Sequence, residues 1–157
     1  MASEAKLGTQ AIGAAGELFV QYRLIKRGID SARLTTDSGI DLAMYVPGTR
    51  IAQTVQVKAT HRPYSVGPSG QLQVAWPFPA DCKAEWLAVV DLSRDRAWML
   101  PIDEALERSR PASPGVQLYW NLEEPRGRVV GVEADFAQYE LDRVMDRLLA
   151  GQTPELP

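Results

Sequence analysis

Residues 39–46 read Gly-Ile-Asp-Leu-Ala-Met-Tyr-Val, and residues 51–58 read Ile-Ala-Gln-Thr-Val-Gln-Val-Lys. In both segments apolar residues tend to recur at every second position, which is the pattern of a β-strand with one buried face. The four residues between them, Pro-Gly-Thr-Arg at 47–50, carry a turn signal. The stretch therefore predicts a β-hairpin, and the pairing of its strands decides which side chains share a face.

A turn over 47–50 sets the register of this hairpin. Leu42 then lies opposite Val55 on the apolar face, and Asp41 lies opposite Gln56 on the other face, with Cβ atoms about 5 Å apart. Lys58 is two residues further along and shares the polar face. A one-residue slip would put the apolar residues of the two strands on opposite faces, so it is disfavoured. A two-residue slip would keep the faces and make Gln56 a diagonal neighbour of Asp41.

The polar face of the hairpin combines oxygen donors with one ammonium group. The carboxylate of Asp41 and the amide oxygen of Gln56 suit a hard divalent cation such as Mg²⁺. An adjacent Lys58 can hold a water molecule or balance charge that develops on a phosphate. Each residue alone is equally typical of a solvated strand face, and only their spacing together favours a metal site.

Residues 9–26 predict a helix, with Thr9 as its N-cap and Gly28 just beyond its C-terminal end. The main apolar stripe at helical spacing consists of Ile12, Ala15, Phe19, Tyr22 and Ile25. Glu17 lies off this stripe, on a side that it shares with Gly13, Val20 and Leu24. Because a helix that is apolar on two sides is usually packed on two sides, we expect Glu17 to point into a cleft. A partly exposed position beside Gln21 is the alternative.

These segments resemble the signature of the PD-(D/E)XK, or restriction-endonuclease-like, nuclease superfamily. The matching stretches are Gly16-Glu17, Gly39-Ile40-Asp41-Leu42 and Gln56-Val57-Lys58-Ala59-Thr60. Glu17 matches the acid on the helix, Asp41 matches the Asp, and Lys58 ends the Glu-x-Lys motif. Gln56 stands where Glu is usual, as it does in members that resemble group I intron homing endonucleases, and Ile40 stands where Pro often precedes the Asp. The resemblance is close over about the first 60 residues and looser to about residue 100.

The resemblance implies an α/β fold, with a restriction-endonuclease-like mixed sheet of about five or six strands flanked by helices. It also implies metal-dependent hydrolysis of phosphodiester bonds in nucleic acid, with DNA as the first expectation and Mg²⁺ or Mn²⁺ as the cofactor. Asp41 would be the principal metal ligand, and Glu17 would bind the ion directly or through water. Gln56 and the backbone carbonyl of Val57 would add neutral oxygens. Lys58 would position the attacking water and stabilise charge on the phosphate.

The charge distribution bears on the expected partner. The net charge of −3 and the isoelectric point of about 5.2 do not by themselves favour phosphate binding. The acidic residues concentrate after residue 80, however, which is compatible with a basic front and an acidic back. Thr60, His61 and Arg62 directly follow Lys58 and are the candidate contacts to nucleic acid.

Two other functions fit the same residues. One is a nuclease-fold module without turnover that binds DNA or another protein, which Gln56 and the acidic isoelectric point favour. The other is one subunit of a larger mobile-element or repair machine that obtains its DNA affinity from a partner. A homodimer is expected if the protein cuts duplex DNA, since two strands must be cut and one domain offers one site. The 116–120 and 136–149 segments are the candidate contact surfaces.

The length of 157 residues fits a single domain over 1–157, with a core at about 9–108 and a C-terminal strand and helix extension at 109–150. No apolar run approaches the ~18 residues of a membrane span, and no export signal is evident. The chain has one cysteine, Cys82, and one histidine, His61. These numbers exclude an intramolecular disulfide and argue against Cys- or His-rich metal sites. We therefore expect a cytoplasmic protein without membrane partners.

The remaining segments predict further elements of the sheet and its flanking helices. Apolar runs bounded by turn residues predict strands at 29–35, 71–76, 86–92, 97–100, 116–120 and 129–132. Helices are expected at 101–108 and 135–150, one helical turn at 80–85, a turn at 37–39 and a loop at 60–70. Pro77 is expected to end the strand at 71–76. The aromatic residues Trp98, Tyr119 and Trp120 are expected to pack rather than to stack on bases.

Overall fold

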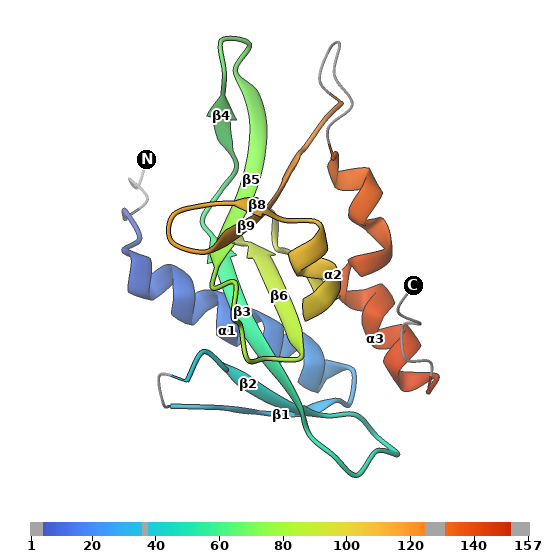
Figure 1. Ribbon diagram of the computed structural model, residues 1–157. Helices are drawn as coiled ribbons and strands as arrows, with labels where there is room; N and C mark the ends of the chain where they lie inside the picture. The colour runs from blue at the N-terminus through green and yellow to red at the C-terminus, as the bar shows by residue number, and fades with distance from the viewer. Residues whose placement is uncertain (1–4, 36–37, 125–130, 152–157) are drawn as a thin grey trace.

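The computed structural model describes residues 5–35, 38–124 and 131–151 (Figure 1). The part of the expected turn at Asp37, the residues Val129 and Val130 of an expected strand, and the C-terminal tail from Gln152 lie outside the described residues. In the described part of the chain, no helix is long and apolar enough to cross a membrane.

The main sheet has five strands in the order β1-β2-β3-β6-β7. Its strands are β1 (Asp30–Arg33), β2 (Leu42–Tyr45), β3 (Gln53–Thr60), β6 (Trp86–Asp91) and β7 (Arg96–Pro101). The β3–β6 pair is parallel and the others are antiparallel, so the sheet is mixed, as predicted. All six residues of β6 are buried, which fits its nearly continuous apolar sequence.

A second, antiparallel sheet of four strands was not predicted. It has the order β4-β5-β9-β8 and consists of β4 (Tyr64–Val66), β5 (Gln71–Phe78), β9 (Val116–Asn121) and β8 (Arg110–Pro111). The prediction of a loop over 60–70 is therefore wrong in part, because β4 and β5 form a hairpin there. The predicted strand break at Pro77 is also wrong, since Pro77 lies opposite Gln117 within β5. Pro77 fits because β4 pairs only with residues 71–73, so that side of β5 is an open edge.

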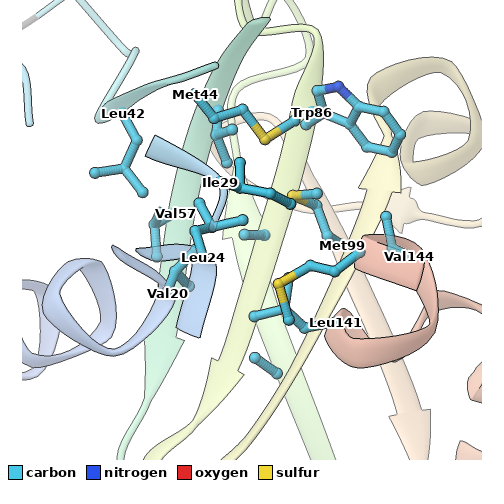
Figure 2. Close-up of a cluster of buried hydrophobic side chains, with 14 of the residues drawn as sticks. Val20, Leu24, Ile29, Leu42, Met44, Val57, Trp86, Met99, Leu141 and Val144 are labelled. Carbon is cyan, nitrogen blue, oxygen red and sulfur yellow. The ribbon is translucent and has the colours of Figure 1, made fainter. Parts of the chain in front are cut away.

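Two helices cover one face of the main sheet, and the third α-helix and the second sheet cover the other face. Helix α1 (Thr9–Lys26) and helix α3 (Leu141–Leu149) contribute to one apolar core; Figure 2 shows Val20 and Leu24 near Val57, with Leu141 and Val144 further along. Helix α2 (Ile102–Glu107) and the second sheet pack on the other face, around Trp76, Trp98 and Trp120. The expected packing role of the two tryptophans Trp98 and Trp120 is thus confirmed. Because Leu118 and Trp120 are buried inside the protein, the 116–120 segment presents few apolar side chains to a partner.

The expected apolar stripe of α1 is confirmed only in part, because Phe19 packs against the core but other members do not. Tyr22 and Ile25 are 60% and 50% exposed, whereas Gly16, Val20 and Leu24 are buried. The helix therefore packs on the side that carries Glu17, which is the side that the sequence analysis expected to face a cleft. Its predicted ends hold to within one residue, with Gly8 at the N-cap and Gly28 in the left-handed conformation after Lys26.

Two further expectations are corrected. Residues 80–85 form turns and bends rather than a helical turn. The helix expected at 135–150 is divided into a 3₁₀ helix, Glu133–Tyr139, and α3, with Glu140 extended between them. Arg96 pairs with both Glu133 and Glu140, and Glu140 forms a bridge with Trp98, so contacts with β7 interrupt the helix. Val132, in the strand expected at 129–132, forms only an isolated bridge to Asn121.

Candidate active site

The β2–β3 hairpin has the register that its sequence predicts, with Leu42 opposite Val55. The pairing of β2 with β3 ends at Leu42, and Asp41 extends the hydrogen bonding between the two segments by one backbone bond and one side-chain bond. The backbone N–H of Asp41 donates to the carbonyl of Val55 at 2.9 Å, and the Asp41 carboxylate atom Oδ2 accepts from the N–H of Val57 at 2.7 Å. A side chain thus takes the place of the next backbone partner, so the carboxylate is held by the strand that carries Lys58.

Helix α1 brings Glu17 close to this hairpin because Gly16 packs tightly on β3. A Cβ atom at position 16 would lie 2.5 Å from the Cβ of Ala59, so no other residue fits without displacement. The side chain of Glu17 is 23% exposed, and its Oε2 accepts from Arg33 of β1, at 2.8 Å from Nη2 and 3.3 Å from Nε. The carboxylate of Glu17 is therefore paired with a cation at the edge of the site.

A hollow of about 480 Å³ brings most of the predicted site residues together. Those that line it are Glu17, Asp41, Val57, Lys58, Thr60, His61 and Arg62. Thr60 Oγ1 bonds the carbonyl of Arg62 at 3.4 Å, which closes the end of the strand. Within the described part of the protein, the Lys58 side chain makes no hydrogen bond or ion pair, so its ammonium group is available to a ligand in this hollow.

Gln56 does not line the hollow. It is only 4% exposed, and its Oε1 accepts a hydrogen bond from Cys82 Sγ at 2.9 Å. Burial raises the pKa of the Cys82 thiol above its ordinary value, so the sulfur keeps the proton that it donates. The sequence does not indicate this contact, since 26 positions separate the two residues and a lone cysteine in a loop gives no signal of its partner.

The electrostatic setting of Asp41 is that of a half-buried acid among mixed charges. Burial raises the pKa of Asp41, the hydrogen bond from Val57 lowers it, and the nearby carboxylate of Glu17 raises it again. Lys58 and Arg33 lower the pKa by their positive charges, but the net shift is upward. A cation bound beside Asp41 would offset the desolvation that causes this shift.

The oxygen donors of the site suit Mg²⁺ or Mn²⁺, which keep bound waters, better than a metal ion whose ligands all come from the protein. Within the described ranges, no group of three or more His, Cys, Asp or Glu side chains is arranged to hold a metal ion. The structure does offer two carboxylates, from Asp41 and Glu17, each with one oxygen free of hydrogen bonds to described residues. Mg²⁺ commonly binds through one or two carboxylates and keeps several waters, so a pair of carboxylates is compatible with it.

Comparisons with known proteins place the fold. The solved structure of a bacterial homing endonuclease, I-Ssp6803I, matches with a TM-score of 0.60 and 17% identity, over 92% of this chain and 95% of that chain. The structure of Hjc, a Holliday junction resolvase from the archaeal hyperthermophile Archaeoglobus fulgidus, matches with a TM-score of 0.51 and 14% identity, over 90% and 97% of the two chains. No family model matches the chain, and no curated protein matches it in sequence. The protein therefore has the restriction-endonuclease-like α/β fold that the resemblance of its motifs implied.

Proposed function

We propose that this protein is a metal-dependent nuclease that hydrolyses phosphodiester bonds in DNA. The observation that carries the proposal is the hollow that Asp41, Glu17 and Lys58 line together. The carboxylate of Asp41 is fixed there by the N–H of Val57, and Lys58 has no hydrogen-bond or ion-pair partner among the described residues. The likeness of the fold to a homing endonuclease and a Holliday junction resolvase supports the same class of reaction.

The roles of the residues follow from their chemistry. Asp41 and Glu17 hold a divalent ion, which when bound supplies Lewis-acid polarisation of the phosphate. The backbone carbonyl of Val57 is a further oxygen donor. Although Gln56 does not line the hollow, its amide oxygen has a second lone pair beside the one that accepts from Cys82, and we assign it as a neutral donor to the ion. Lys58 donates a hydrogen bond to the attacking water or to the phosphate oxygen on which negative charge develops.

Contacts to the nucleic acid are assigned to the segment after β3. His61 and Arg62 line the same hollow as Lys58 and continue its row of nitrogen-bearing side chains toward the β4–β5 hairpin. We propose that residues 1–157 act as one nuclease domain, with a core at about 9–108 and an extension at 109–150. Cleavage of both strands of a duplex would then require two copies of the chain, and thus a homodimer.

A catalytically weak module that binds DNA or protein is the second candidate. It is favoured by a neutral Gln56 whose oxygen is engaged by Cys82, and by the pairing of Glu17 with Arg33. Both features reduce the negative charge that is offered to a metal ion.

Incubation of supercoiled plasmid with the purified protein separates the two candidates. The nuclease predicts nicked or linear product with Mg²⁺ or Mn²⁺, no product with a chelator, and recovery when the metal is restored. Lys58→Met should remove the product without lowering the melting temperature. Retarded migration of DNA without cleavage under any metal condition would favour the binding module, and cleavage that persists in the Lys58 variant would exclude the proposed site.

A further inference from the structure

A second hollow adjoins the candidate active site and shares Lys58 with it. It has a volume of about 600 Å³, which is within the range of small-ligand sites. Its walls come from the end of β5 and the turn between β8 and β9. Its lining is mostly apolar and includes three exposed prolines, Pro77, Pro79 and Pro114. Apart from Lys58, no residue that lines this hollow takes part in the metal site described above.

The walls of this hollow are fixed by the backbone. Phe78 lies opposite Val116 in the β5–β9 pair, and the next residue back, Gly115, is in the left-handed conformation. A Cβ atom at Gly115 would lie 2.5 Å from the carbonyl oxygen of Phe78, so the two segments touch directly. Proline rings do not change shape on binding, so the hollow is formed before a ligand arrives.

The hollow belongs to a row of four hollows, each of which shares at least one lining residue with the next, and we call this row the groove. Lys58 joins it to the hollow of Asp41, and His61 and Arg62 join that hollow to a third one, lined also by Leu72 and Leu92. Leu72 leads on to a region that contains Glu123 and Glu124. The cationic side chains of Lys58 and Arg62 thus line the middle of the groove beside the carboxylates of Asp41 and Glu17, and acidic residues lie at that far end. A phosphate backbone is therefore favoured only near Lys58 and Arg62.

The chemistry of the hollow beside Lys58 suits a base better than a phosphate. Its one acidic residue, Asp81, would repel a phosphate but can accept a hydrogen bond from the amino group of a base. Its exposed proline rings offer flat apolar faces, and enzymes that hold a displaced base pack it between aromatic or apolar side chains. The neighbouring Lys58 would at the same time reach the adjoining phosphate.

We propose that this hollow binds an unpaired nucleobase next to the phosphate that is cleaved, so that the substrate is DNA with at least one unpaired nucleotide at the cut. The inference rests on the proposed nuclease function. A base that is stacked and paired within a duplex does not extend to a hollow beside the strand, whereas single strands, bulges and branches supply such a base at little cost. The hollow thereby selects the form of the DNA rather than its sequence.

Three substrates of one sequence test this inference: a perfect duplex, the same duplex with one bulged nucleotide, and the single strand. Ala80→Trp places a large side chain in the hollow from an exposed turn residue, and Ser69→Trp is the matched control in the acidic region at the other end of the groove. Equal melting temperatures would show that both variants fold. We expect the wild type to cut the bulged or single-stranded DNA at least about tenfold faster than the perfect duplex. Ala80→Trp should abolish this preference, whereas Ser69→Trp should keep it.

Equal cleavage of all three substrates by the wild type, or a preference that survives in Ala80→Trp, would overturn the inference and leave the nuclease intact. If no DNA is cut, the proposed function fails instead, and binding then decides the inference. A 2-aminopurine placed as the bulged base should change its fluorescence with the wild type and the Ser69 variant but not with Ala80→Trp. An identical response from all three proteins would contradict a base in this hollow.

Discussion

The carboxylate of Asp41 accepts a hydrogen bond of 2.7 Å from the backbone N–H of Val57, at the point where β2 leaves β3. The bond fixes one oxygen of the side chain and leaves the other without a hydrogen bond to the described residues. It also completes the hydrogen bonding of an otherwise unpaired strand residue. The same acid therefore serves the hairpin and the proposed chemistry, and experiments must separate the two roles.

Replacement of Asp41 by Asn should make the metal-free protein less dependent on pH. Asn can still accept from Val57, but it does not ionise. Because burial raises the pKa of Asp41, its contribution to folding is present below the ordinary value of 3.8 and is lost as the pH rises through the raised pKa. The stability of the wild type should therefore fall relative to Asp41→Asn across that window and stay level above it. Urea unfolding with a chelator measures this, and a difference that grows in favour of the wild type would refute the assigned burial.

Addition of one methyl group at position 16 should destabilise the protein, although alanine is the better helix former. A Cβ at Gly16 would overlap Ala59, whereas a Cβ at Gly13 meets nothing within 4 Å. We expect Gly16→Ala to cost about 2 kcal/mol of unfolding free energy and Gly13→Ala to add about 0.5–1 kcal/mol. The double variant Gly16→Ala/Ala59→Gly should recover much of the loss in the same denaturation experiment. Equal effects of the two single variants would mean that α1 does not contact β3 at Gly16.

The hairpin and its polar face were predictable because their information is local. The alternation in 40–46 and 51–58 disfavours a one-residue slip, and the turn at 47–50 favours the register that the structure has at Leu42 and Val55. The side of α1 that packs was not predictable from its apolar residues. The decisive feature is a contact made by a glycine, and a stripe of larger residues such as Tyr22 and Ile25 gave the wrong side.

The parts that failed depend on contacts between distant segments. The 135–150 segment has a helical pattern throughout, yet the extended Glu140 bridges to Trp98 and pairs with Arg96 of β7. The environment of Gln56 was likewise not predictable from the sequence. Its partner Cys82 follows β4 and β5 of the second sheet in the sequence, and no local pattern predicted that sheet. Local patterns thus predicted the helix and the hairpin that carry the candidate site. They did not predict the long-range contacts that bury residues such as Gln56.

Conversion of Gln56 to Glu should tighten metal binding and weaken the metal-free fold. A third carboxylate raises the negative charge around the ion, and we expect Mn²⁺ affinity to rise about tenfold. The same charge is placed at a position that is 4% exposed, so the melting temperature without metal should fall by about 3 °C. Calorimetric titration and melting curves with and without Mn²⁺ test both effects. Unchanged affinity and unchanged melting would mean that residue 56 is not a ligand.

Removal of the guanidinium of Arg33 should also tighten metal binding, by freeing a carboxylate rather than by adding one. Arg33 donates to Oε2 of Glu17 and lowers the pKa of Asp41, so it competes with a cation for both acids. We expect Arg33→Gln to bind Mn²⁺ about threefold more tightly than the wild type. Arg50→Gln in the hairpin turn makes the same change of net charge away from the site. A similar gain in both variants would indicate a general charge effect and not release of Glu17.

The rate of plasmid nicking by Asp41→Asn, measured beside the wild type from parallel preparations with saturating Mn²⁺, tests the central claim most directly. The variant keeps an acceptor for the N–H of Val57 but loses the charge that holds the ion. The proposed site predicts metal-dependent nicking by the wild type and a decrease of at least about 100-fold in the variant, whose cooperative melting shows that it is folded. Equal nicking rates for two equally folded proteins would contradict the assignment of Asp41 as the metal ligand of a nuclease.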